Sequence, residues 1–183
     1  MRIFALAVLV FLFAACGTTG KIPPENVSPL LDTSEGVKMY DFQLIYGKNN
    51  VEGWLLVNRN KSGNQRFILT SHIGMSLFDL EGTSDEYRIL YVVDFLDRER
   101  ALDLLWSDFS ILFSPQILKK TNFEINENGN IRMLETGHGP LKTLITAKDY
   151  EGGFPKTIQI DHPRLRLSVL IKQPDNVEGS LLY

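Results

Sequence analysis

The chain is poor in cysteine, in histidine and in excess positive charge, and each shortage excludes a class of protein. Cys16 is the only cysteine, so no disulfide can form within the chain. The three histidines, His72, His138 and His162, include no pair at the i, i+4 spacing of a helical zinc site. A formal net charge of −3 at pH 7 argues against a protein that coats nucleic acid.

Common catalytic motifs are also missing. The sequence contains no G-x-S-x-G elbow, phosphate-binding loop or dinucleotide fingerprint. Asp161 and His162 are neighbours, as are Ser71 and His72, but adjacent strand residues point to opposite faces and cannot directly build a triad. His138 follows a glycine and His162 precedes a proline, so we expect both in turns. We therefore expect a protein that is not an enzyme and needs no metal or cofactor, with a triad of distant residues left open.

The one long apolar run of the chain lies at its N-terminus, from Ile3 to Ala15. Thirteen residues are too few to cross a bilayer but are typical of the hydrophobic region of an export signal. The segment Ala14-Ala15-Cys16-Gly17, which begins at the end of this run, resembles the cleavage site of a bacterial lipoprotein signal, in which the cysteine is lipidated and becomes residue one. We expect residues 1–15 to be this signal and Cys16 to carry the acyl anchor. The alternative is an ordinary signal with an incidental cysteine.

Residues 16–36 contain little apolar sequence. Pro23, Pro24 and Pro29 stand among polar residues, and apolar residues occur only as short pairs such as Leu30-Leu31. This composition predicts a flexible tether. We expect the globular domain to span residues 37–183.

The domain has few helix-forming and many strand-forming residues. Only two alanines, Ala101 and Ala147, follow Cys16. Asn128-Gly129 joins two alternating segments in the pattern of a two-residue hairpin. The sequence predicts a mainly β, antiparallel domain. Its strands are expected near 38–46, 51–59, 65–72, 75–81, 86–93, 122–127, 130–135, 141–149, 156–162 and 164–172.

One segment, between Asp97 and Phe113, has helical periodicity. Apolar residues recur there at spacings of one, three and four, Asp97 is a candidate N-cap, and Pro115 would end the helix. We expect this amphipathic helix to cover one opening of a curved sheet. The periodicity leaves open whether a cavity or a filled core lies beneath it.

Three segments resemble LolB-like outer-membrane lipoproteins of the LolA/LolB superfamily. Residues 66–80, RFILTSHIGMSLFDL, are similar to a strand pair of that family with its short apolar-glycine corner. Residues 155–160 and 165–171, PKTIQI and LRLSVLI, are similar to its closing hairpin, and residues 106–115 to its central helix. The resemblance covers most of residues 38–172 and includes no catalytic signature.

The resemblance implies a half-open antiparallel β-barrel of about ten or eleven strands, lidded by one to three helices, whose apolar concave face receives acyl chains. Members accept lipoproteins from a soluble periplasmic carrier and release them into the outer membrane. The implied location is the outer membrane, with the lipid-anchored domain facing the periplasm. The implied partners are acyl chains, the membrane and a soluble carrier.

Alternating apolar residues supply candidate walls for the ligand cavity, and the alternative for each is a core residue: Trp54, Leu56, Phe67, Leu69, Phe78, Leu80, Tyr91 and Val93. In LolB-like proteins a protruding apolar residue at the corner helps to deliver lipid, and Ile73 holds that place here, before Gly74. His72 stands where a proline is common, which loosens the turn. A second interpretation is a structural or assembly lipoprotein that binds a protein partner along a sheet edge.

Overall fold

The computed structural model describes residues 28–32, 34–60, 63–114 and 122–174. These residues form ten strands, one α-helix and one short 3-10 helix. In chain order they are β1 (Lys38–Tyr46), β2 (Asn49–Arg59), β3 (Gln65–Thr70), β4 (Ser76–Gly82), β5 (Tyr87–Val92), α2 (Glu99–Phe113), β6 (Asn122–Ile125), β7 (Ile131–Thr136), η3 (Gly139–Leu141), β8 (Thr143–Glu151), β9 (Phe154–His162) and β10 (Leu167–Lys172).

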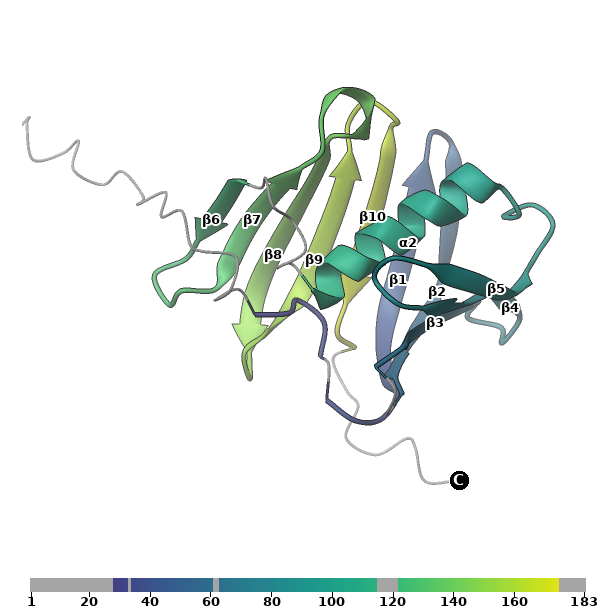
Figure 1. The fold of residues 1–183 in the computed structure, drawn as a ribbon, viewed down its shortest axis with the longest axis horizontal. Coiled ribbons are helices and arrows are strands. Elements are labelled where there is room, and N and C mark those ends of the chain that lie inside the picture. Colours follow the sequence, from purple (N-terminus) through teal and green to yellow (C-terminus); the bar gives the residue numbers. More distant parts are fainter. Residues whose placement is uncertain (1–27, 33, 61–62, 115–121, 175–183) are drawn as a thin grey trace, which may run out of the picture.

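The strands form one antiparallel sheet in the order β5-β4-β3-β2-β1-β10-β9-β8-β7-β6 (Figure 1). Successive strands mostly pair as hairpins, and the pairing of β1 with β10, Phe42 opposite Ile171, joins the two halves of the chain. Strands β5 and β6 are the edges, so the curved sheet does not close. The mainly β, half-open barrel expected from the sequence is confirmed.

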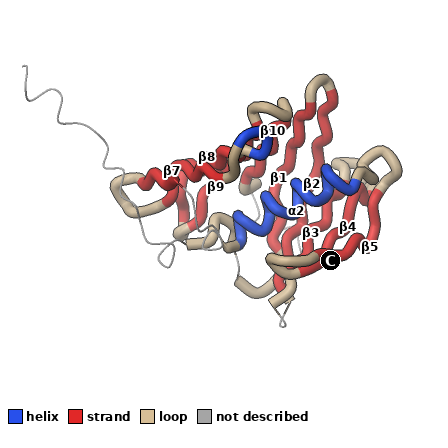
Figure 2. Tube along the Cα trace, turned by 45° about the horizontal axis from the view of Figure 1, so that its top comes forward, coloured by secondary structure: helices blue, strands red, loops and turns tan. Residues whose placement is uncertain are grey.

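Helix α2 crosses the inner face of the sheet, as Figures 1 and 2 show. Its apolar side is buried, and the ring of Phe109 stacks on Phe67 of β3 with 4.5 Å between centroids. Phe113 meets the same Phe67 ring edge-on at 5.3 Å. The expected amphipathic helix therefore forms and covers the curved sheet, because this face can be buried only against another apolar face.

The start of the helix differs from the sequence prediction. Arg98, not Asp97, occupies the N-cap position, and no side chain caps the helix there. Asp97 belongs to the preceding turn, where its N–H donates to the carbonyl of Val93 at 3.1 Å. Asp97 lies one residue before the N-cap position, so its side chain does not cap the first helical turn. Pro115, the expected stop, lies outside the described residues.

The expected flexible tether is wrong for its described part. Leu30 and Leu31 are fully buried in the core. Their N–H groups both donate to the carbonyl of Leu112, at 2.8 and 3.3 Å, and so cap the last turn of α2. Lys38 and Asp32 form an ion pair of 2.9 Å beside them. The domain therefore begins before residue 37. The expected signal, Cys16 and the tether as far as residue 27 lie outside the described residues.

Candidate functional site

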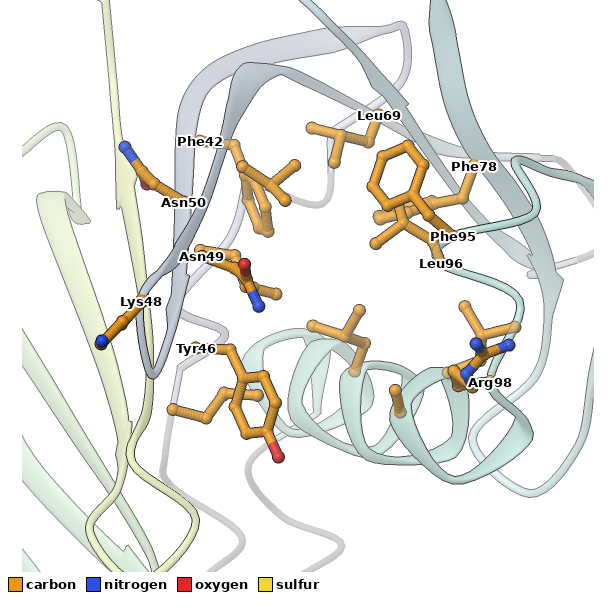
Figure 3. A pocket seen from close by; sticks show the side chains of 16 residues that line it. Phe42, Tyr46, Lys48, Asn49, Asn50, Leu69, Phe78, Phe95, Leu96 and Arg98 are labelled. Carbon is orange, nitrogen blue, oxygen red and sulfur yellow. The ribbon is translucent and has the colours of Figure 1, made fainter.

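A cavity of about 670 Å³ lies between the inner face of the sheet and the N-terminal half of α2 (Figure 3). Most of its wall is apolar, with Phe42 and Leu44 from β1, Leu69 from β3, and Leu102 and Leu105 from the helix. The register places Leu69 directly opposite Phe78, which lines the cavity from β4. Val51 lines the cavity from β2, which lies between β3 and β1, so the alternation of apolar residues in four neighbouring strands builds one continuous wall.

Under the C-terminal half of α2 the same face is filled. Phe67 and Leu80 lie opposite each other, one step along from Leu69 and Phe78, and both are fully buried. The rings of Phe109 and Trp106 cover Phe67. The inner face thus contains both of the arrangements that helical periodicity left open: a packed core at one end and a cavity at the other. Of the predicted wall residues, Leu69 and Phe78 line the cavity.

The prediction that Trp54 and Leu56 line the inner face is wrong. Leu55 lies opposite Leu69, and Val57 lies opposite Phe67, so these two residues point inward. Trp54 and Leu56 therefore point to the outer face, where Trp54 is exposed. Residues 54–57 are an unbroken apolar run, and such a run does not reveal which alternate pair is buried.

The inward placement of Tyr91 is also wrong. Leu80 pairs with Ile89, whereas Asp79 pairs with Tyr91, so Leu90 is an extra residue in β5. This bulge turns Tyr91 to the outer face with Asp79. Val93 follows β5, packs half-buried against the core and donates its N–H to the carbonyl of Leu77 at 3.0 Å. It does not line the cavity.

Several lining residues were not identified from the sequence. Phe95 and Leu96 lie in the turn before α2, where no periodic pattern marks them. Tyr46, Asn49 and Lys48 belong to the end of β1 and the turn into β2. The alternation of apolar residues through β1 is the sequence signal that places Tyr46 on the same face as Phe42. Polar turn residues become cavity residues here because the hairpin extends beyond the end of β3.

The corner between β3 and β4 projects from the same end of the sheet as the cavity. Ile73 is 82% exposed, as a protruding corner residue requires. Gly74, at φ +85°, donates its N–H to the carbonyl of Ser71 at 2.9 Å. The N–H of Ser71 donates to the carbonyl of Met75 at 2.8 Å, so two backbone hydrogen bonds hold the corner. The His72 ring packs edge-on to Trp54 at 5.4 Å, a contact that fixes the residue expected to loosen the turn.

Other large apolar side chains are exposed at this end of the strands. Tyr46 ends β1, Met75 precedes β4, Phe95 follows β5, and Leu141 lies between β7 and β8. Antiparallel pairing brings these four positions to one rim of the sheet, together with Ile73. Leu141 lies in the other half of the sheet, whereas Tyr46, Ile73, Met75 and Phe95 belong to connections of the β1–β5 half, and exposed apolar residues at one rim are typical of a surface that meets another apolar phase.

A buried polar network ties α2 to the far half of the sheet. His162 Nε2 lies 2.8 Å from Asp108 Oδ2, and His162 Nδ1 lies 3.3 Å from Thr143 Oγ1. Burial raises the pKa of Asp108, and its hydrogen bond with His162 opposes that rise. His162 is the last residue of β9, opposite Leu167, so its expected position in a turn is wrong. The three side chains have the order of a nucleophile, a base and an acid, but they are sealed in the core away from the cavity.

The described residues offer little for other kinds of site. Among them, no group of three or more histidine, cysteine or acidic side chains could hold a metal ion. In the same part of the chain, no helix has the length and hydrophobicity needed to cross a membrane. In comparisons with known proteins, the chain matches no family model, and no curated sequence is significantly similar to it.

Proposed function

We propose that the protein is a membrane-anchored lipoprotein that binds acyl chains of a lipid or lipoprotein cargo in the cavity under α2. The cavity carries this proposal. Its volume of about 670 Å³ lies within the ~300–1,000 Å³ range of small-molecule sites, and its wall is mostly apolar. Side chains around an empty apolar space lack packing partners, and an acyl chain would supply them. Each methylene moved from water would contribute about 0.8 kcal/mol.

Ile73 and the rim around it would bring the cavity to a bilayer. Leaving an isoleucine in water forfeits on the order of 1.5–3 kcal/mol of burial energy, so its exposure suggests a compensating use. Contact of Ile73 with acyl chains or membrane is the use we propose. It agrees with the position of the cavity at the same end of the sheet. No catalytic step, metal or cofactor is part of this function.

The membrane location rests on the sequence. We propose that Cys16 is the lipid anchor, that the domain faces the periplasm from the outer membrane, and that a soluble carrier supplies the cargo. Cys16→Ser should abolish the partition of the processed protein into the membrane fraction, because the anchor would be lost. Membrane association of that variant after removal of residues 1–15 would contradict the anchor.

The binding function is tested by filling the cavity from the helix. Ala101 lines it and is exposed, so Ala101→Trp should occupy the space without disturbing the core. We expect mass spectrometry of organic extracts to find acyl material in the wild-type protein and much less in Ala101→Trp. Ser107→Trp, also at an exposed position of α2 but outside the cavity, is the matched control. A wild type without acyl material or affinity for a fluorescent acyl probe would exclude the function.

A second candidate function is partner binding along β5. This edge strand exposes Ile89, Leu90 and Tyr91, and its outer backbone groups have no neighbouring strand among the described residues. An extended segment of another protein could pair there. Leu90→Lys should then abolish partner binding and leave acyl-probe affinity unchanged, whereas Ala101→Trp should do the reverse.

A further inference from the structure

The polar part of the cavity wall is confined to two segments. Tyr46, Lys48, Asn49 and Asn50 surround the turn between β1 and β2, and Arg98 immediately precedes α2. Every other lining residue is apolar, and no carboxylate is among them. The cavity therefore has an apolar interior and two polar segments, and the only charged group that each segment contributes to the wall is a cation.

These two cations keep donors available for a ligand. Among the described residues, neither Lys48 nor Arg98 forms an ion pair with a carboxylate. Arg98 donates one hydrogen bond, from Nη1 to the carbonyl of Asp97 at 3.0 Å. A guanidinium carries five N–H groups, so most of them can still reach a ligand.

Additional positive charge lies beside the hairpin. The N–H of Gly47 donates to the carbonyl of Arg166 at 3.2 Å, which holds the turn after β9 against the turn after β1. Arg166 takes up a left-handed conformation, with φ +53°, and its side chain is exposed, as is that of Arg164. Asp94, Asp97 and Glu99 lie near Arg98 in the chain and moderate its field, but none of them lines the cavity.

Figure 3 shows how these groups are arranged. Arg98 lies across the cavity from the hairpin, with the apolar side chains of Phe78, Phe95 and Leu96 along one side between them. Lys48 extends away from the cavity. A headgroup beside Arg98 would therefore receive its hydrogen bonds from the guanidinium, while the Lys48 ammonium contributes positive charge from outside the cavity.

We infer that the cavity selects amphiphiles with an anionic headgroup, a carboxylate or a phosphate, which Arg98 binds while the acyl chain fills the apolar interior. The inference rests on the proposed function, because it names the ligand class of the same cavity. A charged donor makes a stronger hydrogen bond to an anion than to a neutral hydroxyl. A cationic headgroup would meet like charge with no carboxylate in the cavity wall to offset it.

The test compares four ligands that share a twelve-carbon chain, all below their micelle concentrations: laurate, dodecyl phosphate, dodecanol and dodecyltrimethylammonium. Affinities are measured at pH 8 by displacement of a neutral fluorescent acyl probe. We expect the wild type to bind laurate or dodecyl phosphate about tenfold more tightly than dodecanol, the factor for one charge-assisted hydrogen bond. The trimethylammonium ligand should bind more weakly than dodecanol. The stronger of the two anions identifies the headgroup as carboxylate or phosphate.

Arg98→Gln should remove most of the preference for anions, and Lys48→Gln a smaller part, with dodecanol affinity unchanged in both. Arg59→Gln, at the opposite end of β2, is the matched control and should retain the full preference. Equal wild-type binding of the anions and dodecanol would overturn the inference but leave acyl binding intact. Preference that survives in the Lys48→Gln/Arg98→Gln double variant would overturn it too. Failure of all four ligands and of the probe would remove the proposed function itself.

Discussion

At the scale of single residues, Asp108 and His162 form a buried polar pair in which each side chain depends on the other for a hydrogen bond. Both side chains are almost completely buried, so removing either one leaves the other's polar atom without its partner. Asp108→Ala should therefore lower the free energy of unfolding by about 3–5 kcal/mol. Urea unfolding measures this loss. Asp103→Ala, at an exposed position of the same helix, should cost far less. A loss below about 1 kcal/mol for Asp108→Ala would show that the pair does not hold the helix.

Tyr40 gives the stability a dependence on alkaline pH. Burial raises the pKa of Tyr40 to about 12, and the charge of Asp32 adds to the rise. The folded state thus favours the protonated phenol. This contribution is complete below pH 10 and is lost as the pH rises from 10 to about 12, by up to about 3 kcal/mol. Unfolding free energies measured across this range should fall more steeply for the wild type than for Tyr40→Phe. Parallel curves would contradict the assignment.

Ile73 separates stability from membrane contact. Because its side chain is already in water, Ile73→Glu should change the free energy of unfolding by less than about 0.5 kcal/mol. The same variant should impair transfer of a fluorescent acyl probe from the protein to phospholipid vesicles. Val37→Glu is the matched control, since Val37 is also exposed but precedes β1, at the end of that strand opposite the rim. Equal transfer rates in the two variants would contradict the proposed contact of Ile73 with acyl chains or membrane.

At the scale of elements, the segment before β1 behaves as part of the core. Leu31 is fully buried, so Leu31→Ala should cost about 2–5 kcal/mol in unfolding free energy. Thermal or urea unfolding of the variant provides the measurement. A free tether would show no change at all, which makes the substitution a direct test of docking. Val37→Ala, at an exposed position nearby, should have little effect.

The elements themselves were largely predictable, because alternation and turn chemistry are local properties. Each of the ten expected strands forms within a few residues of its expected place. The direction of side chains was less predictable. In β2 the four consecutive apolar residues offered two equivalent faces, and in β5 the extra residue Leu90 reversed the face of Tyr91. Both outcomes depend on pairing with neighbouring strands, and the burial of Leu30 depends on contacts with Leu112 far along the chain.

At the scale of the whole molecule, the two ends of α2 have different surroundings. Its C-terminal half presses Phe109 and Phe113 against a filled core, while its N-terminal half spans the cavity. Asp108 and His162 lie between these regions and attach the helix to β9. The sheet is therefore rigidly packed where the two halves of the chain meet the helix and open where the exposed apolar rim lies. The candidate site could be anticipated only as an apolar inner face, because the division into core and cavity depends on where the helix crosses.

The attachment of Leu30 to Leu112 also fixes how far a lipidated Cys16 could stand from the domain. Leu30 lies fourteen residue steps after Cys16, a reach of about 50 Å at full extension. The attachment lies at the C-terminal end of α2, and the fifteen-residue helix places the cavity side of the molecule about 22 Å further on. This reach exceeds the length of the helix, so an anchored domain could turn its rim toward the leaflet that holds Cys16. The anchored domain could then act only within a few nanometres of the membrane that holds Cys16.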